Sequence, residues 1–369
     1  MNFWQNLPIP ILTVAPMADV TDAAFRQLIA KYSAHTRVDG TKGGPDVMWT
    51  EFVSADGLVR ATPEGKVKLL ADLKYSEIER PIVAQLFSSN PEHMEQAAAL
   101  CLEFGFDGID INMGCPDRSI EKQGCGSAMI KTPEVAKAVI QAAKRGARSE
   151  VVEGIPVSVK TRLGYNIDEV EEWIPALLQE GIAALSVHAR TRADMSMVPA
   201  RWERVARVAE LRDIHAPETR ILGNGDVLSR RDALAKINQS GADGAMVGRA
   251  LFGNPWFFHP DRRLPLALNA LPTKGVNRDT IISEDRGDSC VEYIEVVERL
   301  QVLAEHAELF ADLLPHKNFA VMKKHCKAYV NGFNGAAELR RQLMEEADTA
   351  ERLREIIFQF LARKFPDVN

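Results

Sequence analysis

Short apolar runs alternate with longer amphipathic stretches from the start of the chain to about Phe258. This alternation is typical of repeated βα units around a parallel sheet. Helical spacing is found at residues 91–104, 133–145, 167–180 and 229–239, with N-caps expected at Asn90, Thr132 and Ser229. Strands are expected at residues 11–18, 46–54, 81–87, 108–114, 156–164, 184–191, 220–227 and 244–251. Eight such units predict an α/β fold of the TIM (β/α)8 barrel type.

Two polar segments interrupt this pattern, and the chain changes character after the second. Residues 32–45 are rich in Gly, Thr and charge, and we interpret them as a long loop after the first strand. Residues 263–289 are polar with several Pro, Arg and Asp, which is typical of a linker. From Cys290 onward apolar residues recur at helical spacing, as at Val296, Leu300 and Leu303. We therefore expect a barrel domain at 1–262, a linker at 263–289 and an all-helical domain at 290–369.

Composition places the chain among ordinary globular proteins, with 46% hydrophobic and 26% charged residues. The first residues lack the basic and apolar segments of a secretory signal, and no apolar run has the length needed to span a bilayer. We therefore expect a cytoplasmic protein. Its 5 cysteines are odd in number and lack metal-ligand spacing, so we expect neither a disulfide scaffold nor a metal site.

The net charge is −6, which weighs against a large basic surface for nucleic acid. Net charge describes the whole chain, however, and basic residues gather locally. They do so at Lys323, Lys324 and Lys327, and again at Arg340 and Arg341. A local contact surface for phosphate groups is therefore compatible with the acidic total.

Polar residues gather where the expected strands end, which is where TIM barrels carry their catalytic groups. Gly225 and Gly248 follow the last two strands, where barrels commonly bind a phosphate, and Arg249 adds a positive charge. Lys160 lies in an otherwise apolar strand, so its burial requires an anionic partner. That partner is either a carboxylate such as Asp110 or an electron-rich bound group.

Cys115 occupies a Gly-Cys-Pro sequence at the end of an expected strand, where its side chain projects from the turn. A free cysteine is usually a small buried hydrophobic residue, but this position favours a chemical role. Cys101 falls in a helical pattern, and Cys290 and Cys326 lie beyond the barrel, so we expect packing roles for them. A lone strand histidine such as His188 is also most simply a packing residue.

Several motifs follow one another in order from Ala15 to about Trp256. They are Ala15-Pro16-Met17, Gln85-Leu86-Phe87, Asp110-Ile111-Asn112-Met113-Gly114-Cys115-Pro116, Gly124-Cys125-Gly126-Ser127, Lys160-Thr161-Arg162, His188-Ala189-Arg190-Thr191-Arg192, Gly223-Asn224-Gly225-Asp226 and Gly248-Arg249-Ala250. In this combination the chain resembles the tRNA-dihydrouridine synthase family. The resemblance implies a TIM barrel that holds FMN and a C-terminal helical domain that helps to grip tRNA.

The resemblance also implies roles for individual residues. Cys115 falls on the family's proton donor, and Asn112, Arg162 and Arg190 fall where the family approaches its substrate. The implied cofactor-binding residues are Pro16, Met17, Ala18 and Gln85 at the isoalloxazine, Lys160 and His188 at the flavin, and Asn224, Gly225, Asp226, Gly248 and Arg249 at its ribityl phosphate. NADPH or NADH would reduce FMN, a hydride from flavin N5 would reach C6 of uracil, and Cys115 would protonate C5. We expect no metal, and we expect a monomer.

The sequence departs from the family pattern in three places. There is extra length at residues 32–45, residues 193–199 lack the tyrosine and glycine that many members have, and Cys125 replaces a frequent alanine. These changes affect substrate loops more than the cofactor set.

Two other functions compete with this interpretation. The first is an FMN barrel that acts on a free pyrimidine, such as a dihydroorotate dehydrogenase, although that enzyme has no need of a basic helical tail. The second is a non-catalytic RNA-binding barrel, which would need neither Cys115 nor Lys160.

Overall fold

The computed structural model describes residues 2–150, 154–263, 292–293 and 295–365. The chain forms two compact units. The barrel unit contains Met1–Thr21 and Asp46–Gly248, and the helical unit contains Asp22–Pro45 and Arg249–Asn369. The predicted linker at 263–289 lies outside the described residues apart from Arg263. Residues 22–45 group with the C-terminal part of the chain, which the sequence pattern does not indicate.

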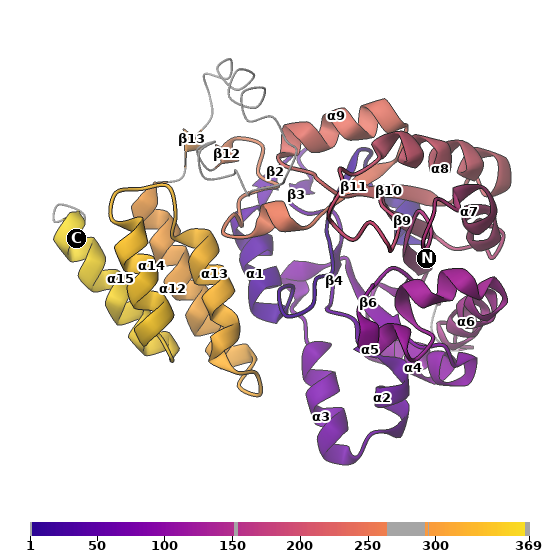
Figure 1. The fold of residues 1–369 in the computed structure, drawn as a ribbon, viewed down its shortest axis with the longest axis horizontal. Helices are drawn as coiled ribbons and strands as arrows, with labels where there is room; N and C mark the ends of the chain where they lie inside the picture. Colours follow the sequence, from indigo (N-terminus) through magenta and orange to yellow (C-terminus); the bar gives the residue numbers. More distant parts are fainter. Residues whose placement is uncertain (1, 151–153, 264–291, 294, 366–369) are drawn as a thin grey trace. The chain divides into compact units, whose positions relative to one another are not determined.

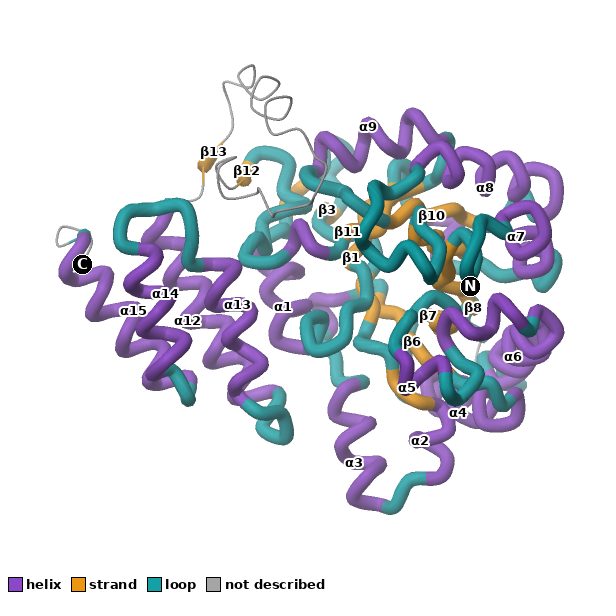
Figure 2. Tube along the Cα trace, viewed as in Figure 1, coloured by secondary structure: helices purple, strands orange, loops and turns teal. Residues whose placement is uncertain are grey.

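The barrel unit is built on one parallel sheet, drawn in orange in Figure 2. Its strands follow the order β1-β11-β10-β9-β8-β7-β6-β4, and β5 also pairs with β6. A parallel bridge between Thr13 and Val47 links the two ends of this order, so the sheet is a nearly closed barrel. The strands are β1 (Ile11–Val14), β4 (Met48–Trp49), β5 (Val53–Ser54), β6 (Ile82–Phe87), β7 (Gly108–Asn112), β8 (Val157–Arg162), β9 (Ala184–His188), β10 (Arg220–Asn224) and β11 (Gly244–Val247). The predicted TIM barrel is confirmed, with the second predicted strand split in two.

Side chains alternate between the two faces of each strand, so the inner face can be read at every second residue. The amino-terminal part of the interior is apolar and includes Trp4, Trp49, Val83, Leu222 and Met246, all fully buried. Further along the same strands the inner face becomes polar. The polar side chains of the barrel interior therefore lie toward the carboxyl ends of the strands, where barrels of this type carry their active sites.

Four outer helices of this unit follow the predicted segments. They are α4 (Pro91–Glu103), α6 (Pro133–Gly146), α7 (Val170–Leu178) and α9 (Arg230–Ser240). The unit also contains helices that were not among those segments: α2 (Ala55–Arg60), α3 (Pro63–Asp72), the short α5 (Arg118–Glu121) and α8 (Trp202–His215). Figure 1 shows α2 and α3 extending away from the strands. Asn90 and Ser229 cap their helices as predicted, but the Thr132 side chain makes no capping bond, because its backbone (φ −133°, ψ 64°) is not in the usual extended N-cap conformation.

The helical unit begins with α1 (Ala23–Tyr32), a helix that the sequence analysis missed. Residues 32–45 are therefore not a loop that follows the first strand. Instead, α1 ends at Tyr32, and the following residues form an antiparallel pair of short strands, β2 (His35–Thr36) and β3 (Lys42–Gly43). The alternation of Ala24, Phe25, Leu28 and Ile29 at helical spacing carried the missed signal.

The remaining helices of this unit are α12 (Val296–Leu313), α13 (Met322–Tyr329), α14 (Ala336–Glu346) and α15 (Ala350–Lys364). Their inward residues form one apolar core with α1, which includes Leu28, Leu303, Phe310, Leu343 and Ile357. A pair of two-residue strands, β12 (Arg262–Arg263) and β13 (Glu292–Tyr293), also belongs to the unit. The helices that were predicted after Cys290 are thus confirmed in the described residues.

The chain also forms short 3-10 helices, namely η1 (Phe3–Asn6), η2 (Glu77–Glu79), η3 (Gly126–Lys131), η4 (Arg249–Leu251) and η6 (Phe319–Val321). Among the described helices, none combines the length and apolar character that crossing a bilayer requires.

Candidate active site

Polar side chains occupy the inner face of four neighbouring strands at their carboxyl ends. Parallel pairing places Gln85 opposite Asp110, Asn112 opposite Lys160 and Arg162 opposite His188. Because side chains alternate along a strand, these residues share one face of the sheet. The structure therefore brings together polar residues from β6, β7, β8 and β9 on one face of the sheet.

Three side chains of this face form a continuous hydrogen-bonded relay. Gln85 Nε2 donates to Asp110 Oδ2 at 2.6 Å, and Asn112 Nδ2 donates to Gln85 Oε1 at 3.1 Å. Asn112 Oδ1 then accepts from the backbone N–H groups of Gly114 at 3.1 Å and Cys115 at 2.9 Å. The relay thus runs from the interior of the barrel to the backbone of Cys115.

Asp110 is fully buried at the inner end of this relay. Its other oxygen accepts from Ser158 Oγ at 2.6 Å. Burial raises the pKa of Asp110 to about 6, and the hydrogen bonds from Ser158 and Gln85 and the charge of Lys160 oppose that rise. The carboxyl group is therefore mostly ionised at pH 7.5.

The backbone of Cys115 is held on both sides. Its N–H donates to Asn112, while its carbonyl accepts from the N–H of Ser127 at 2.9 Å. Ser127 Oγ also lies 2.9 Å from that carbonyl. Gly126, at φ +61°, lies so close that a Cβ there would be 2.6 Å from the carbonyl oxygen, so only glycine fits.

The Cys115 side chain is half-buried and packs against an apolar cluster of Phe87, Ile120 and Cys125. Burial raises the pKa of the Cys115 thiol above its usual value, which the nearby charges of Lys160 and Arg162 only partly oppose. The sulfur is therefore a protonated thiol at neutral pH. A thiol in this state can give a proton, whereas a nucleophilic cysteine needs the thiolate.

Lys160 has no carboxylate within ion-pairing distance in the described part of the chain, so it does not form the ion pair with Asp110 that was one of its two sequence interpretations. Burial lowers the pKa of Lys160 to about 8, Arg162 lowers it further, and Asp110 and Cys115 oppose the change. A desolvated ammonium group without a carboxylate is a strong donor for an electron-rich ligand.

Arg162 is buried and bonds mainly to backbone carbonyls. Its Nε donates to Gly114 O at 2.7 Å, and its Nη1 lies 3.1 Å from Thr191 O and 3.3 Å from Met195 O. Burial lowers its pKa to about 10. The side chain therefore joins the turn before Cys115 to the loop after β9 and still brings positive charge to the thiol.

Arg190 and Asp226, which were predicted for substrate and cofactor, bind each other in an ion pair. Arg190 Nε also donates to Val198 O at 2.6 Å, and its Nη1 lies 3.2 Å from His188 Nε2. Asp226 further accepts from the N–H of Ala200 at 2.9 Å. These contacts fix the loop after β9. The charges of Arg190 and Asp226 therefore mainly stabilise this loop.

The predicted phosphate residues follow β10 and β11. Asn224 Nδ2 donates to Met246 O at 2.7 Å, and Trp202 Nε1 donates to Gly225 O at 2.8 Å. A Cβ at Gly225 would lie 2.9 Å from Ala200, so packing requires this glycine. Gly248 is half-buried and ends the barrel unit, and the exposed Arg249 begins the helical unit.

The first predicted cofactor segment is a turn directly after β1. Pro16 and Met17 are half-buried, and Ala18 is exposed. Thr21 Oγ1 accepts from the N–H of Met17 at 2.9 Å, which fixes the turn. A Cβ at Gly248 would be 3.4 Å from Met17 Sδ, so this turn and the end of β11 are neighbours.

Sequence reasoning missed a second support of the cysteine loop. Glu121 forms an ion pair with Arg192 and lies 2.9 Å from Ser127 Oγ. The Arg192 guanidinium and Lys131 Nζ lie 5.2 and 4.2 Å from the ring centre of Tyr165. Arg192 belongs to the family motif and could have indicated this support. No local sequence pattern connects it to Glu121, however, which lies 71 residues earlier.

The other described cysteines lie in packing environments, as was expected for Cys101 and Cys326. Cys101, Cys125 and Cys326 are buried and unpaired, and burial raises the pKa of each thiol. Cys290 lies outside the described residues. Cys115 is thus the most exposed cysteine that the structure describes.

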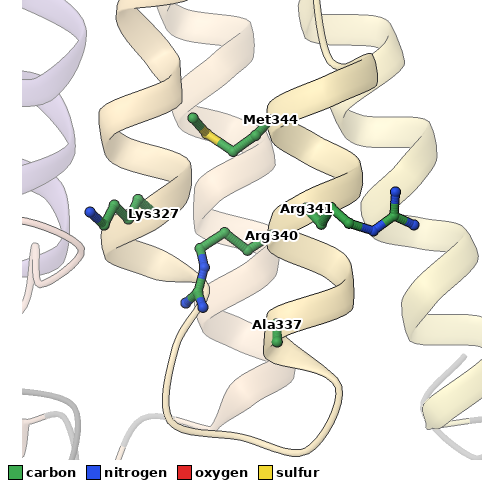
Figure 3. Close-up of a pocket in the computed structure, with 5 residues that line it drawn as sticks. All are labelled: Lys327, Ala337, Arg340, Arg341 and Met344. Carbon is green, nitrogen blue, oxygen red and sulfur yellow. The ribbon is translucent and has the colours of Figure 1, made fainter.

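A basic pocket lies on the helical unit between α13 and α14. It has a volume of about 260 Å³ and is lined by Lys327, Ala337, Arg340, Arg341 and Met344 (Figure 3). Arg341 is paired with Glu338 and Glu345. Lys327 and Arg340 have no carboxylate partner within the described residues, and Arg340 Nη1 donates to Val330 O at 3.0 Å.

Fold and site together define the class of this protein: a TIM-type barrel enzyme with a protonated thiol and two desolvated cations at the carboxyl ends of its strands. Residues 13–364 match the family described as "Dihydrouridine synthase (Dus)", and the chain belongs to that family.

Curated relatives match over nearly their whole length. A "Probable tRNA-dihydrouridine synthase" of Staphylococcus aureus (strain MRSA252) is 36% identical, with 100% of this chain and 98% of the relative covered. "Probable tRNA-dihydrouridine synthase 2" of Bacillus subtilis (strain 168) is 37% identical over 99% of this chain and 98% of its own. The Staphylococcus epidermidis RP62A relative, also a "Probable tRNA-dihydrouridine synthase", is 37% identical over 98% and 97%.

Proposed function

We propose that this protein reduces the C5–C6 bond of specific uridines in tRNA to give dihydrouridine. The observation that carries the proposal is the placement of the Cys115 thiol, protonated and held by its backbone beside Lys160 and Arg162, in a chain of the dihydrouridine synthase family. Reduction of a uracil ring needs a hydride at one carbon and a proton at the other. A fixed thiol supplies the proton.

The residues at the strand ends fit FMN, the cofactor that the family resemblance implies. Lys160 is a desolvated cation that has no carboxylate partner among the residues the structure describes, which suits the electron-rich edge of a flavin ring. Pro16, Met17, Ala18 and Gln85 would line the ring, with His188 beside it. The phosphate would be held by Asn224, Gly225, Asp226, Gly248 and Arg249, where Asp226 contributes by fixing the loop through Arg190.

Bound FMN supplies hydride chemistry, with NADPH or NADH as the external reductant. The chain's own contribution is acid catalysis and orientation. Cys115 Sγ gives its proton to C5 of the uracil, which avoids a free enolate and accelerates the reaction by roughly 10²–10⁴-fold. Asn112 and Arg162 orient the ring, and the positive charge of Arg162 stabilises negative charge that develops on its oxygens.

The substrate must present a uridine that has left its stack. Extrusion of a base costs a few kcal/mol, roughly, and is easiest for a loop nucleotide. On the helical unit, the unpaired charges of Lys327 and Arg340 suit two phosphates of the RNA backbone. The positive charge is local, so it is compatible with the overall charge of −6. The proposal includes a cytoplasmic monomer, because tRNA is its substrate and one chain carries all the proposed site residues.

The test is a single-turnover experiment on the purified protein. The flavoprotein is reduced anaerobically with NADPH, and the return of oxidised flavin absorbance is followed after addition of unmodified tRNA, free uridine or orotate. We expect rapid reoxidation by tRNA alone. Reoxidation by orotate and not by tRNA would favour the free-pyrimidine oxidoreductase, and a protein that binds no flavin would favour a non-catalytic RNA-binding barrel.

A further inference from the structure

The relay that ends at Cys115 has a direction. Gln85 and Asn112 carry amide groups with one donor end and one acceptor end of nearly equal shape, so partners decide which end faces which way. At the outer end, the N–H groups of Gly114 and Cys115 can only donate. Asn112 must therefore present its oxygen to them, and its Nδ2 must find an acceptor elsewhere.

The inner end of the relay supplies that acceptor through Gln85. An ionised carboxylate accepts on both oxygens and donates on neither. Asp110 takes a hydrogen bond from Gln85 Nε2 on one oxygen and from Ser158 Oγ on the other. Gln85 is therefore turned with its oxygen toward Asn112. Every hydrogen bond of the relay can therefore form, because one end of it consists of backbone N–H donors and the other end of a carboxylate acceptor.

We propose that Asp110 is a positioning residue for Cys115: by accepting from Gln85, it fixes the orientation of the Gln85 and Asn112 amides and so holds the backbone N–H of Cys115. This inference deepens the proposed function and rests on it for the role of the thiol. It also explains a buried carboxylate that forms no ion pair with Lys160, since burial of an unpaired charge is otherwise strongly unfavourable.

The consequence for the reaction is geometric. Without the acceptor at Asp110, Gln85 is free to turn its oxygen inward, and Asn112 then loses the partner of its Nδ2. The turn at residues 114–115 becomes looser, and the thiol samples positions away from the substrate carbon. A misplacement of about 1 Å can lower turnover by about 100-fold.

Three variants separate this role from general packing. Asp110→Val removes the acceptor with a side chain that suits a strand. Asp110→Asn keeps an acceptor, because its oxygen can still face Gln85 while its Nδ2 donates to Ser158 Oγ, whose own proton can go to Ile109 O at 3.2 Å. Ser158→Ala is the matched control, because it removes the other hydrogen bond to Asp110 and leaves the relay intact.

The direct measurement is amide hydrogen exchange with residue-level resolution on the full-length protein as purified, at pH 7.5. We expect Asp110→Val to accelerate exchange at Gly114 and Cys115 by about tenfold, with other barrel amides unchanged. Asp110→Asn and Ser158→Ala stay within about twofold of the parent. In tRNA assays, kcat of Asp110→Val falls by about 10- to 100-fold, with little change in KM.

Three results overturn the proposal. They are unchanged protection at these two amides in Asp110→Val, equal loss in Asp110→Asn, and a rise spread evenly over the barrel. If Asp110→Val does not fold, Gln85→Met breaks the relay at its middle with a side chain of similar size, and unchanged protection there is equally decisive. Exchange is measured without RNA, so a parent protein that forms no dihydrouridine would sink the proposed function and leave the relay result standing.

Discussion

Each of the two units buries a cluster of polar side chains, and the two clusters differ in their hydrogen bonding. In the barrel unit, Asp110, Gln85 and Asn112 are buried and bonded to one another. In the helical unit, His306 and His325 are buried with their ring centres 4.5 Å apart, yet none of their four ring nitrogens has a hydrogen-bond partner among the described residues.

The surroundings of the two histidines are aromatic. Phe25 lies 5.9 and 5.4 Å from their ring centres, and Phe252 stacks on His325 at 5.7 Å. Burial lowers the pKa of His306 to about 3 and that of His325 well below its usual value, so both rings are neutral. The barrel cluster is fully hydrogen-bonded and reaches the backbone of Cys115, whereas the histidine pair is buried without hydrogen bonds and lowers the stability of the unit that contains it.

The largest effect is expected from removal of the proton donor. Cys115→Ala should lower dihydrouridine formation by roughly 10²–10⁴-fold while flavin content stays normal, because only the acid is lost. Mass spectrometry of the tRNA and flavin absorbance measure the two quantities. Cys125→Ala, which changes the buried neighbour in the same apolar cluster, is the control and should remain active. Normal turnover in Cys115→Ala would end its role as donor.

Removal of the desolvated cation should affect the cofactor. Lys160→Ala is expected to weaken FMN retention by about tenfold or more, since one charge-assisted contact is lost. Equilibrium dialysis against FMN measures this. The control is Lys144→Ala, another half-buried lysine of the barrel unit, which lies on α6 and whose Nζ donates to Glu180 O at 2.8 Å, just after α7. Normal flavin affinity in Lys160→Ala would refute the assignment.

The histidine pair makes the helical unit sensitive to acid. Between pH 6.5 and about 3 the unfolded chain binds protons that the folded chain does not, so stability falls as the pH falls through this window. At pH 5 the loss is about 2 kcal/mol for His306, and the lowered pKa of His325 acts in the same direction. His306→Phe should therefore reduce the pH dependence of urea unfolding and stabilise the unit at pH 7 by about 1 kcal/mol. The exposed His215, changed to Gln, should alter neither. An unchanged pH dependence in His306→Phe would contradict this account.

The smallest effect is expected on the basic pocket of the helical unit. Lys327→Gln and Arg340→Gln should each raise KM for tRNA a few-fold and lower the salt dependence of binding by about one unit of slope. Arg341→Gln is the control from the same pocket, because Arg341 is already paired with Glu338 and Glu345. Equal effects of all three substitutions would mean that the ion pairs of Arg341 do not reduce its contribution to tRNA binding.

Sequence periodicity predicted the barrel well because each buried strand is a local apolar run with a polar residue at its end. It missed α1 although Ala24, Phe25, Leu28 and Ile29 lie at helical spacing, and the partners of this helix in the apolar core lie some 280 positions later, at residues such as Leu303 and Ala307. No window of local sequence contains that partner. It also expected a capping bond from Thr132 that the backbone angles do not allow.

For the site, motif order predicted which residues gather, but not what each one touches. Arg190 and Asp226 were assigned to substrate and phosphate, yet they bind one another across 36 residues. The direction of the Gln85 and Asn112 amides also depends on a carboxylate 25 residues from Gln85. Such contacts depend on strand register, which the residue types alone do not encode.

The central claim is that this chain reduces tRNA uridine with Cys115 as the acid. Its most direct test is fragment mass spectrometry of unmodified tRNA after incubation with the protein, FMN and NADPH. We predict a gain of two hydrogens at a defined uridine, absent with Cys115→Ala. NADPH-dependent flavin reduction with no change in mass across several tRNAs would contradict the account.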